Sequence, residues 1–377
     1  MVSSMPRVSL GDVAREVKQR APEGAACPSV GLEHLDPDEI ELSRWNEDRE
    51  NTFTKSFSRG QVLFGRRRAY LRKAAVAPFD GVCSGDITVI EARETLSPRL
   101  LPFIIQNEAL FKHAVSNSAG SLSPRVKWQS LAQFEFNLPA RDQQEKLADL
   151  LWTAQDTRNH YKQLLSICDD VIKSQFVEMF SDGGFPRRSL SSLSTSMQNG
   201  LSPSKAGIHR AKVLTLSAIT QGSFDESAWK EGAFKDDPSL DKRVSGGCYY
   251  VCRGNGNRSL VGTGEFAPSS IPDLVFPDTM IEVRVKQGEV LPAYLTIAWK
   301  QPFTRDQIER SAKTTNGTYK INQKALGEVE IPVPPLSLQQ EFASFVAEVD
   351  KSKFAIQKAL DELNATTKKI LNQELGL

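Results

Sequence analysis

Two long stretches of the chain have an apolar residue at every seventh position. In the later stretch these positions are Phe342, Val349, Ile356, Leu363 and Ile370, with Phe345 and Ala359 on a neighbouring row. In the earlier stretch they are Leu147, Ala154, Tyr161 and Cys168, beside Leu150, Leu164 and Val171. Each stretch runs for about 35 residues without Pro or Gly, longer than an ordinary globular helix. Because a strict seven-residue repeat makes a narrow apolar stripe, the pattern favours two helices packed on each other over two helices lying on a core.

A short alternating strand precedes each long helix, so the same unit occurs twice. The segment "VKWQSLAQFEFNLPARDQQEKLADLL" matches "INQKALGEVEIPVPPLSLQQEFASFV", about 195 residues later. The alternating apolar positions are Phe134, Phe136 and Leu138 in the first copy, and Val329, Ile331 and Val333 in the second. Proline ends each strand, and Gln-Gln-Glu follows at the start of each helix. A fainter echo, "PRVSLGDVAREV" at Pro6 and "PRRSLSSLSTSM" at Pro186, could be a chance match.

The repeat predicts the organisation of the chain. Two mixed α and β domains, 1–139 and 182–335, each precede a long helix, 140–181 and 336–377. The symmetry of the repeat makes the two helices antiparallel, so the fold class is α+β with an antiparallel coiled coil and an internal pseudo-twofold repeat. At 1.5 Å per residue, each helix is a rod of about 50 Å. The two helices would hold two globular parts apart like a ruler.

The composition indicates the cellular location of the protein more clearly than its function. The 47 basic and 46 acidic residues nearly cancel, so any nucleic-acid surface must come from local segregation of charge. There is no apolar run of about 18 residues and no apolar core behind the first charges, which predicts a cytoplasmic protein that does not cross a membrane. The five cysteines are scattered and odd in number, as expected for reduced thiols.

One segment departs from the overall balance of basic and acidic residues. "FGRRRAYLRK" carries Arg66, Arg67, Arg68, Arg72 and Lys73 around Tyr70, and no acid occurs between Ser58 and Lys73. A run of charge is usually a solvated face. Here it follows the apolar start "QVLFG", which predicts a strand or hairpin supported by a core, and arginine suits planar contacts to phosphate and guanine. The run is therefore a candidate DNA-binding segment.

Weaker candidates lie in loops of both halves. The first half offers Ser118, Arg125 and Lys127 in "SNSAGSLSPRVK"; the second offers Arg253, Asn257 and Arg258 in "CRGNGNRSL", and Lys313 and Asn316 in "RSAKTTNGTYK", which also contains Lys320. Hydroxyls, amides and cations around Gly bind phosphates and base edges, but they are also ordinary turn residues. Their recurrence at the same place in both copies strengthens the prediction. The segment 20–45 could lie near DNA or cover the core.

No constellation for catalysis is visible. The four histidines form no metal-spaced pair, and Cys248 and Cys252 lack a second pair, so a buried strand is the better interpretation and no metal site is predicted. A glycine–lysine phosphate loop is missing, as is the Asn/Asp-Pro-Pro-aromatic motif of DNA amino-methyltransferases. Three hypotheses remain: a non-catalytic DNA-reading subunit, a coiled-coil adaptor whose halves bind proteins, and, opposed by the missing motifs, a restriction enzyme or methyltransferase.

The chain resembles the DNA-specificity subunit of type I restriction–modification systems over nearly all of its length. The resemblance rests on the duplicated strand, Pro, Gln-Gln-Glu and helix unit, and on "GQVLFGRRRAYLRKAAVAPFDGVCSGDI" (residues 60–87). It implies two target-recognition domains, each reading half of a split site in double-stranded DNA. It also implies two adenine methyltransferase subunits docked on the helices and domains, and two translocating nuclease subunits. S-adenosylmethionine, ATP and Mg would then be bound by those partners, with no cofactor on this chain.

Overall fold

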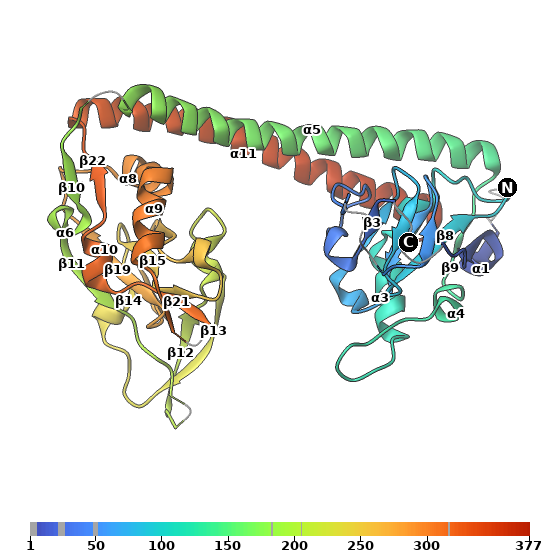
Figure 1. Cartoon of the computed structure of the whole chain (residues 1–377), viewed down its shortest axis with the longest axis horizontal. Coiled ribbons are helices and arrows are strands. Elements are labelled where there is room, and N and C mark those ends of the chain that lie inside the picture. Colours follow the sequence, from blue (N-terminus) through green and yellow to red (C-terminus); the bar gives the residue numbers. More distant parts are fainter. Residues whose placement is uncertain (1–5, 22–26, 48–51, 182–183, 205, 316) are drawn as a thin grey trace. The chain divides into compact units, whose positions relative to one another are not determined.

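The computed structural model describes the chain except for residues 1–5, 22–26, 48–51, 182–183, 205 and 316. It divides into two units (Figure 1). The first unit is Met1–Gln163 with Gln357–Leu377, and the second is Leu164–Ile356. Among the described residues, no helix has the length and apolarity needed to cross a lipid bilayer.

The first unit combines a four-stranded sheet with short helices. Its strands are β1 (Arg7–Ser9), β2 (Ala14–Val17), β3 (Ser29–Val30), β4 (Lys55–Phe57), β5 (Val62–Gly65), β6 (Ala74–Val76), β7 (Gly81–Cys83), β8 (Ile87–Ala92) and β9 (Glu135–Asn137). Its short helices are α1 (Leu10–Val13), η1 (Leu32–His34), η2 (Ala69–Leu71), α2 (Leu101–Ile105), α3 (Glu108–Ser116) and α4 (Trp128–Leu131). The main sheet has the order β2-β8-β5-β6, a smaller sheet has the order β3-β7-β4, and β1 pairs with β9.

The second unit repeats this plan with additions. Its strands are β10 (Arg187–Ser189), β11 (Ser194–Asn199), β12 (His209–Leu214), β13 (Trp229–Phe234), β14 (Arg243–Val244), β15 (Tyr249–Cys252), β16 (Gly254–Asn255), β17 (Gly264–Phe266), β18 (Ile271–Val275), β19 (Met280–Val285), β20 (Lys313–Thr315), β21 (Thr318–Lys320) and β22 (Glu330–Pro332). Its short helices are α6 (Leu190–Leu193), α7 (Ser217–Thr220), η3 (Leu240–Lys242), η4 (Arg258–Leu260), α8 (Pro292–Lys300), α9 (Pro302–Ser311) and α10 (Gln323–Gly327). The sheets have the orders β11-β19-β15-β17, β13-β12-β18-β14 and β16-β21-β20, and β10 pairs with β22.

One inner strand of each of the sheets β2-β8-β5-β6 and β11-β19-β15-β17 is buried on both faces. In β5, Phe64 enters one apolar core and Leu63 enters another; in β15, Val251 and Tyr250 do the same. Successive side chains of a strand point to opposite faces, so a strand between two cores reads as a continuous apolar run. This explains the runs "VLFG" and "YYVC".

The repeat seen in the sequence is also a repeat of structure. In both units a strand, a one-turn helix and a second strand follow one another, β1-α1-β2 and β10-α6-β11. The first strand pairs antiparallel with the strand before the long helix: Val8 lies opposite Phe136, and Arg188 opposite Ile331. The faint N-terminal echo is therefore a real repeat. The predicted α+β class, with two related mixed domains and two long helices, is confirmed.

The long helices are α5 (Arg141–Phe180) and α11 (Leu336–Leu375). In the first unit the start of α5 packs with the end of α11, since Leu147 and Leu151 share a core with Leu371 and Leu375. In the second unit the end of α5 packs with the start of α11. There Phe176 lies 5.6 Å from Phe342, ring centre to ring centre. Within each unit the two helices are thus antiparallel.

The predicted apolar rows are partly covered on both helices, and on α11 the other buried apolar positions, Val346, Leu360, Leu371 and Leu375, lie outside the predicted row. On α11, Phe342 is buried, and Val349, Ile356, Leu363 and Ile370 are half-buried. On α5, Leu147 is buried and Ala154, Tyr161 and Cys168 are half-buried, while the most covered positions include Ala148, Leu151, Gln155, Ile172 and Phe176. The neighbouring row Leu150, Leu164 and Val171 was wrong, because all three side chains are exposed. Leu151 is buried in the core of the first unit, a tertiary effect that spacing alone does not reveal.

A buried glutamine joins each long helix to its unit. The Gln144 side chain accepts a hydrogen bond from Ser97 N (2.8 Å) and donates to the Pro139 carbonyl (2.9 Å). The Gln339 side chain likewise accepts from Leu291 N and donates to Pro334 O, both at 2.8 Å. The equivalent glutamine is thus the second of Gln-Gln-Glu in one copy and the first in the other. Each side chain satisfies backbone groups that helix starts and loops leave unpaired.

Candidate nucleic-acid interface

The basic run forms the connection between two paired strands of the main sheet. Residues 66–73, here called the basic loop, join β5 to β6, and Gly65 N donates to Lys73 O at 2.8 Å to close the hairpin. The turn η2 lies within it. Its two flanking residues, Arg68 and Arg72, have positive φ values of 53° and 54°. Left-handed backbone is uncommon for residues with a Cβ, and it gives this loop a defined path rather than a loose one.

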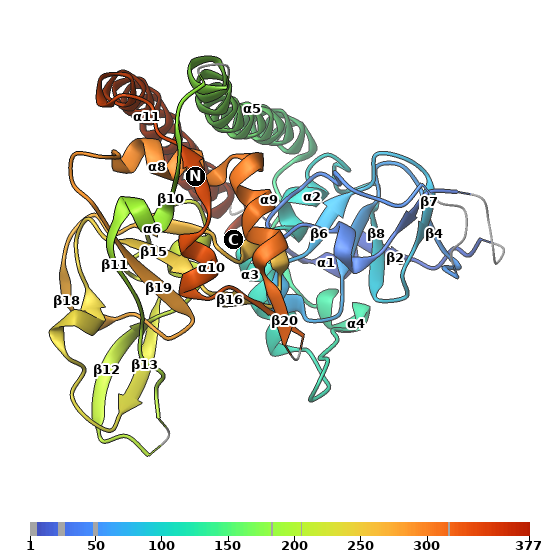
Figure 2. The ribbon, with the colours of Figure 1, turned by 60° about the vertical axis from the view of Figure 1, so that its left-hand side comes forward.

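A second loop is fastened against the basic loop. Residues 117–127, here called the α3–α4 loop, extend away from the long helices of their unit (Figures 1 and 2). Arg68 N donates to Pro124 O at 2.8 Å, and Val126 N donates to Arg66 O at 3.0 Å. Arg67 and Arg125 face each other across an antiparallel bridge. The fold therefore brings two segments more than 50 residues apart into one cationic surface.

An acidic residue, Asp86, lies between two of these arginines. Arg125 contacts both carboxylate oxygens, from Nε at 2.7 Å and from Nη2 at 3.3 Å. Arg67 Nη1 lies 3.6 Å from the same carboxylate, and its Nη2 donates to Ser123 Oγ at 3.0 Å. The hydrogen bond from Arg125, and then the charges of Arg125 and Arg67, lower the pKa of Asp86. Asp86 in turn raises the pKa of Arg125, so both groups stay charged near neutral pH.

Three other members of the predicted set, Arg68, Tyr70 and Lys127, are exposed to solvent, whereas Ser118 is not. Arg68 and Lys127 are exposed, and in the described part of the chain neither side chain has a hydrogen-bond or ion-pair partner. Tyr70 is also exposed, at 55% of its surface. Ser118 is half-buried, and its hydroxyl donates to Ala114 O at 2.8 Å, which ends α3 rather than facing solvent.

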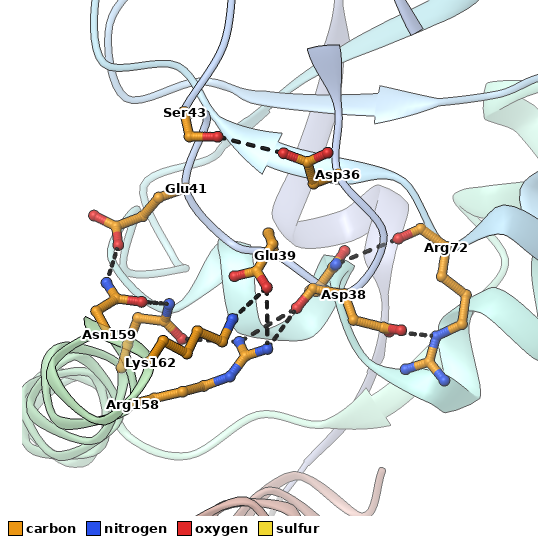
Figure 3. Close-up of polar contacts among 11 residues, drawn as sticks. Asp36, Asp38, Glu39, Glu41, Ser43, Arg72, Arg158, Asn159 and Lys162 are labelled. Atoms are coloured by element: carbon orange, nitrogen blue, oxygen red, sulfur yellow. Dashed lines mark hydrogen bonds and ion pairs between the residues drawn. The ribbon is translucent and has the colours of Figure 1, made fainter. Parts of the chain in front are cut away.

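Two members of the basic loop are held by their own unit instead. Lys73 Nζ donates to Leu32 O at 2.7 Å. Arg72 Nε lies 2.7 Å from Asp38 Oδ1, in the acidic segment shown in Figure 3. Burial and these contacts leave Arg72 and Lys73 fewer free donors for DNA than the sequence pattern indicated.

The acidic segment, residues 36–43, fastens the basic loop to α5. Its Asp38 carbonyl accepts from Arg158, and the Glu39 carboxylate pairs with Arg158 and Lys162 (Figure 3). Ile40 is buried in the core of the unit. Of the two interpretations left open for residues 20–45, covering the core therefore describes this part.

The second unit has the same two-segment arrangement. Arg253 N donates to Thr279 O at 2.8 Å, and Ile321 N donates to Arg253 O at 2.9 Å. The first unit has Arg66 N to Asp86 O at 2.9 Å and Val126 N to Arg66 O at 3.0 Å. By these bonds Arg253 is equivalent to Arg66, and Thr279 to Asp86. The bridge between Gly254 and Lys320 is the equivalent of the bridge between Arg67 and Arg125.

The predicted residues of the second unit have mixed environments. Arg253 is half-buried and donates to Asp278 O at 3.1 Å, and Asn257 caps η4 by accepting from Ser259 N at 3.1 Å. Arg258 donates to Glu309 O at 2.6 Å and lies 6.0 Å from the Tyr319 ring centre. Lys313 is exposed on β20, as is Lys320 on β21. Asn316 lies outside the described residues.

Asp86 and Ser123 were not among the residues predicted from sequence. An acid after the glycine in "CSGDI", 13 residues after the end of the basic run, is a weak local signal. Its pairing with Arg67 and Arg125 depends on three segments that only the fold brings together.

The two cysteines that were weighed as half of a zinc site lie at a buried strand. Cys248 and Cys252 are buried at the strand β15, where burial raises the pKa of the Cys252 thiol to about 11. A thiol that stays protonated is a poor metal ligand, because the thiolate is the binding form. Among the described residues no group of three metal-ligating side chains is suited to hold an ion.

Comparison with known proteins agrees with this geometry. Residues 252–365 match the family described as "Type I restriction modification DNA specificity domain". Two solved structures align with 99% of this chain and 97% of their own. One is a chain from a type I restriction–modification system, at 16% identity and a TM-score of 0.56. The other is the S subunit of such a system from M. genitalium, at 11% identity and a TM-score of 0.52. No curated protein sequence matches.

The match in sequence runs from Cys252, the last residue of β15, through most of α11. It includes the two paired loops of the second unit and the buried Gln339. The likeness in structure covers both units, and at these identities it establishes the fold. Residues 252–365 are therefore similar to the type I restriction–modification DNA specificity domain family, and the whole chain has the fold of the specificity subunits of those systems.

Proposed function

We propose that this chain is the non-catalytic DNA-reading subunit of a type I restriction–modification complex. Each unit reads one half of a bipartite site in double-stranded DNA. The observation that carries the proposal is the repeated loop pair: in both units, backbone hydrogen bonds at matching positions hold two loops together, and each pair has exposed cations, Arg68 and Lys127 or Lys313 and Lys320. Cations supply affinity for phosphate, and fixed side chains in such loops supply sequence discrimination.

The long helices support the division of the site into two parts. Each is 40 residues long and contributes residues to both units. A continuous helix rises about 1.5 Å per residue, so it sets a fixed distance between whatever its ends carry. A two-part reader needs such a spacer, because half-sites on one face of B-DNA lie about one turn, roughly 34–36 Å, apart.

The exposed faces of the helices are the proposed docking surface for two methyltransferase subunits, with two restriction and translocation subunits joining them. Leu150, Leu164 and Val171 form an exposed apolar row on α5. Apolar rows on a helix favour a protein partner over solvent. S-adenosylmethionine, ATP and Mg belong to those partners in this proposal.

The test is a map of methylated adenines in DNA from cells that express this chain with its neighbouring methyltransferase. The proposal predicts one split motif, with two short half-sites around a fixed gap. The control is the methyltransferase alone. No methylation beyond that control, despite a co-purifying complex, would instead favour a protein-binding adaptor.

A further inference from the structure

We infer that Asp86 is a positioning residue that fixes Arg67 and Arg125 as a rigid pair for reading one base edge, rather than for holding phosphate. The inference rests on the proposed function and specifies which part of the first unit discriminates sequence. The base edge would be one that offers two hydrogen-bond acceptors. In the major groove guanine offers O6 and N7, which guanidinium groups match in plane and spacing.

The first reason is that both guanidinium groups are already held in place. Arg125 meets the two oxygens of Asp86 side-on, at 2.7 and 3.3 Å. Arg67 is held between Asp86 at 3.6 Å and Ser123 Oγ at 3.0 Å. The backbones of the two arginines are also bridged to each other. A donor that is fixed before binding loses less conformational entropy on binding and tolerates less error in the position of its partner.

The second reason is charge. Two arginines around one carboxylate carry a net charge of one unit, so the group attracts phosphate less than its two guanidinium groups would alone. Phosphate contacts depend on net charge and tolerate side-chain motion, as at the exposed and unpaired Arg68 and Lys127. The pair still reaches solvent, because the Arg67 and Arg125 side chains are 38% and 44% exposed. The group of Arg67, Asp86 and Arg125 therefore has a lower net charge than two free arginines, and its guanidinium donors remain accessible and oriented.

The third reason is the contrast with the second unit. There the equivalent positions are Gly254, Thr279 and Lys320. No second cation and no carboxylate accompany Lys320 at these described positions, so the second unit has no fixed pair at the place equivalent to Arg67 and Arg125. The effect of losing Asp86 should consequently fall on one half-site only.

The experiment is selection of DNA duplexes by the full chain in complex with its methyltransferase, from a library randomised across both half-sites of the methylated motif. For Asp86→Asn we expect the preference at one position of one half-site to fall roughly 5- to 150-fold. The other half-site should keep its preferences. Affinity for duplexes of unrelated sequence should be equal or higher, because a negative charge is removed.

Two further variants make the test decisive. Arg125→Lys keeps the charge but loses the two-atom contact with Asp86, so it should relax the same position while leaving the salt dependence of binding unchanged. This exposed position also serves if Asp86→Asn does not fold. Glu135→Gln is the matched control, because it removes the carboxylate that pairs with Arg7 at 2.9 Å elsewhere in the unit. It should change no preference.

The possible results separate the inference from the proposed function. A wild-type complex with no preference at any position would overturn the proposed function itself. A selective wild type whose preferences survive both Asp86→Asn and Arg125→Lys would overturn only the inference. Weaker binding of Asp86→Asn to all sequences alike, with a lower salt slope, would also overturn it, because the arginines would then be phosphate contacts.

Discussion

At the place where the first unit has Arg67, Asp86 and Arg125, the second has Gly254, Thr279 and Lys320. The backbone hydrogen bonds around these positions nevertheless have nearly the same lengths, 2.9 and 3.0 Å in the first unit against 2.8 and 2.9 Å in the second. The backbone frame is thus shared by the two units, while Arg67 and Asp86 of the first unit are replaced by Gly254 and Thr279 in the second. Ladder hydrogen bonds use main-chain atoms, so outward-facing side chains can change without disturbing the loops.

The contrast extends to how each cationic surface is stiffened. In the first unit a carboxylate holds two guanidinium groups, whereas in the second Arg258 lies against the Tyr319 ring and Lys313 and Lys320 stay exposed. Under the proposed function, two units built in this way would read two different half-sites. The repeated backbone therefore supports the loops in both units, and the side chains that would give specificity differ between the units.

The largest change in stability is expected at the residues by which the long helices enter the cores of the two units. It tests whether the two units depend equally on the long helices for their stability. Phe342 is buried among Phe176, Phe180 and Tyr294, and Leu147 is its equivalent in the first unit, eight residues after the proline. Phe342→Ala should lower the free energy of unfolding by about 4 kcal/mol, and Leu147→Ala by about 3 kcal/mol, because each leaves a cavity. Urea denaturation measures both.

The matched control for that pair lies on the same helix. Phe354 on α11 is 74% exposed, so Phe354→Ala should change the free energy of unfolding by less than about 0.5 kcal/mol. A decrease comparable to that of Phe342→Ala would mean that the stripe of α11 faces the other way.

The next prediction tests which glutamines of the two sequence copies are equivalent. Gln144→Ala and Gln339→Ala should each cost about 2 kcal/mol, since each leaves buried backbone groups without partners. Gln143→Ala and Gln340→Ala, at exposed neighbours, should cost little. If Gln340→Ala were the damaging change, the literal Gln-Gln-Glu alignment would hold in place of the structural one. Chemical denaturation of the four variants decides between these alignments.

A smaller effect separates phosphate binding from base reading. Arg68→Ala and Lys127→Ala should weaken binding to all duplexes, and each should reduce the slope of log affinity against log salt by about 0.9, because one phosphate is no longer neutralised. Lys313→Ala should do the same through the second unit. Lys146→Ala removes an exposed charge on α5 and is the control. A weaker preference at a single base, with an unchanged slope, would reassign these residues to base reading.

The weakest effect concerns pH. Because Arg125 lowers the pKa of folded Asp86 below its unfolded value, the ionised pair stabilises the fold above that unfolded pKa. The contribution disappears as pH falls through the lower, folded pKa. Stability of the wild type and of Asp86→Asn, compared by acid titration, should therefore converge at the acid end. A difference that persists below the folded pKa would show that the carboxylate acts through packing instead of charge.

Much of the architecture is legible in local patterns. Proline at the strand ends and the absence of Pro and Gly over long stretches define the helices, and the structure extends them only to 40 residues each. Alternating apolar residues before Pro139 and Pro334 identify β9 and β22. These features were predictable because backbone preference and the period of burial act over a few residues at a time.

The side of α5 that is buried was less predictable. Its sequence offers two adjacent apolar rows, and the row with Leu150, Leu164 and Val171 is exposed. The choice depends on what the globular parts present to the helix: Trp152, for example, donates to Arg99 O and lies against Phe103. Such contacts join residues about 50 positions apart, and no local period encodes them.

The order of residues along the chain was enough to establish the duplication, the two long helices, the mixed α and β class and the basic loop as the most cationic segment. Which cations remain free depended on folding. The fold turned Lys73 and Arg72 inward, left Arg68 and Lys127 unpaired among the described residues, and put Asp86 between Arg67 and Arg125. The physical reason is the separation along the chain of the residues that interact. Helix and strand patterns arise from neighbours along the chain, whereas the orientation of a guanidinium depends on carboxylates and carbonyls that folding brings from distant segments.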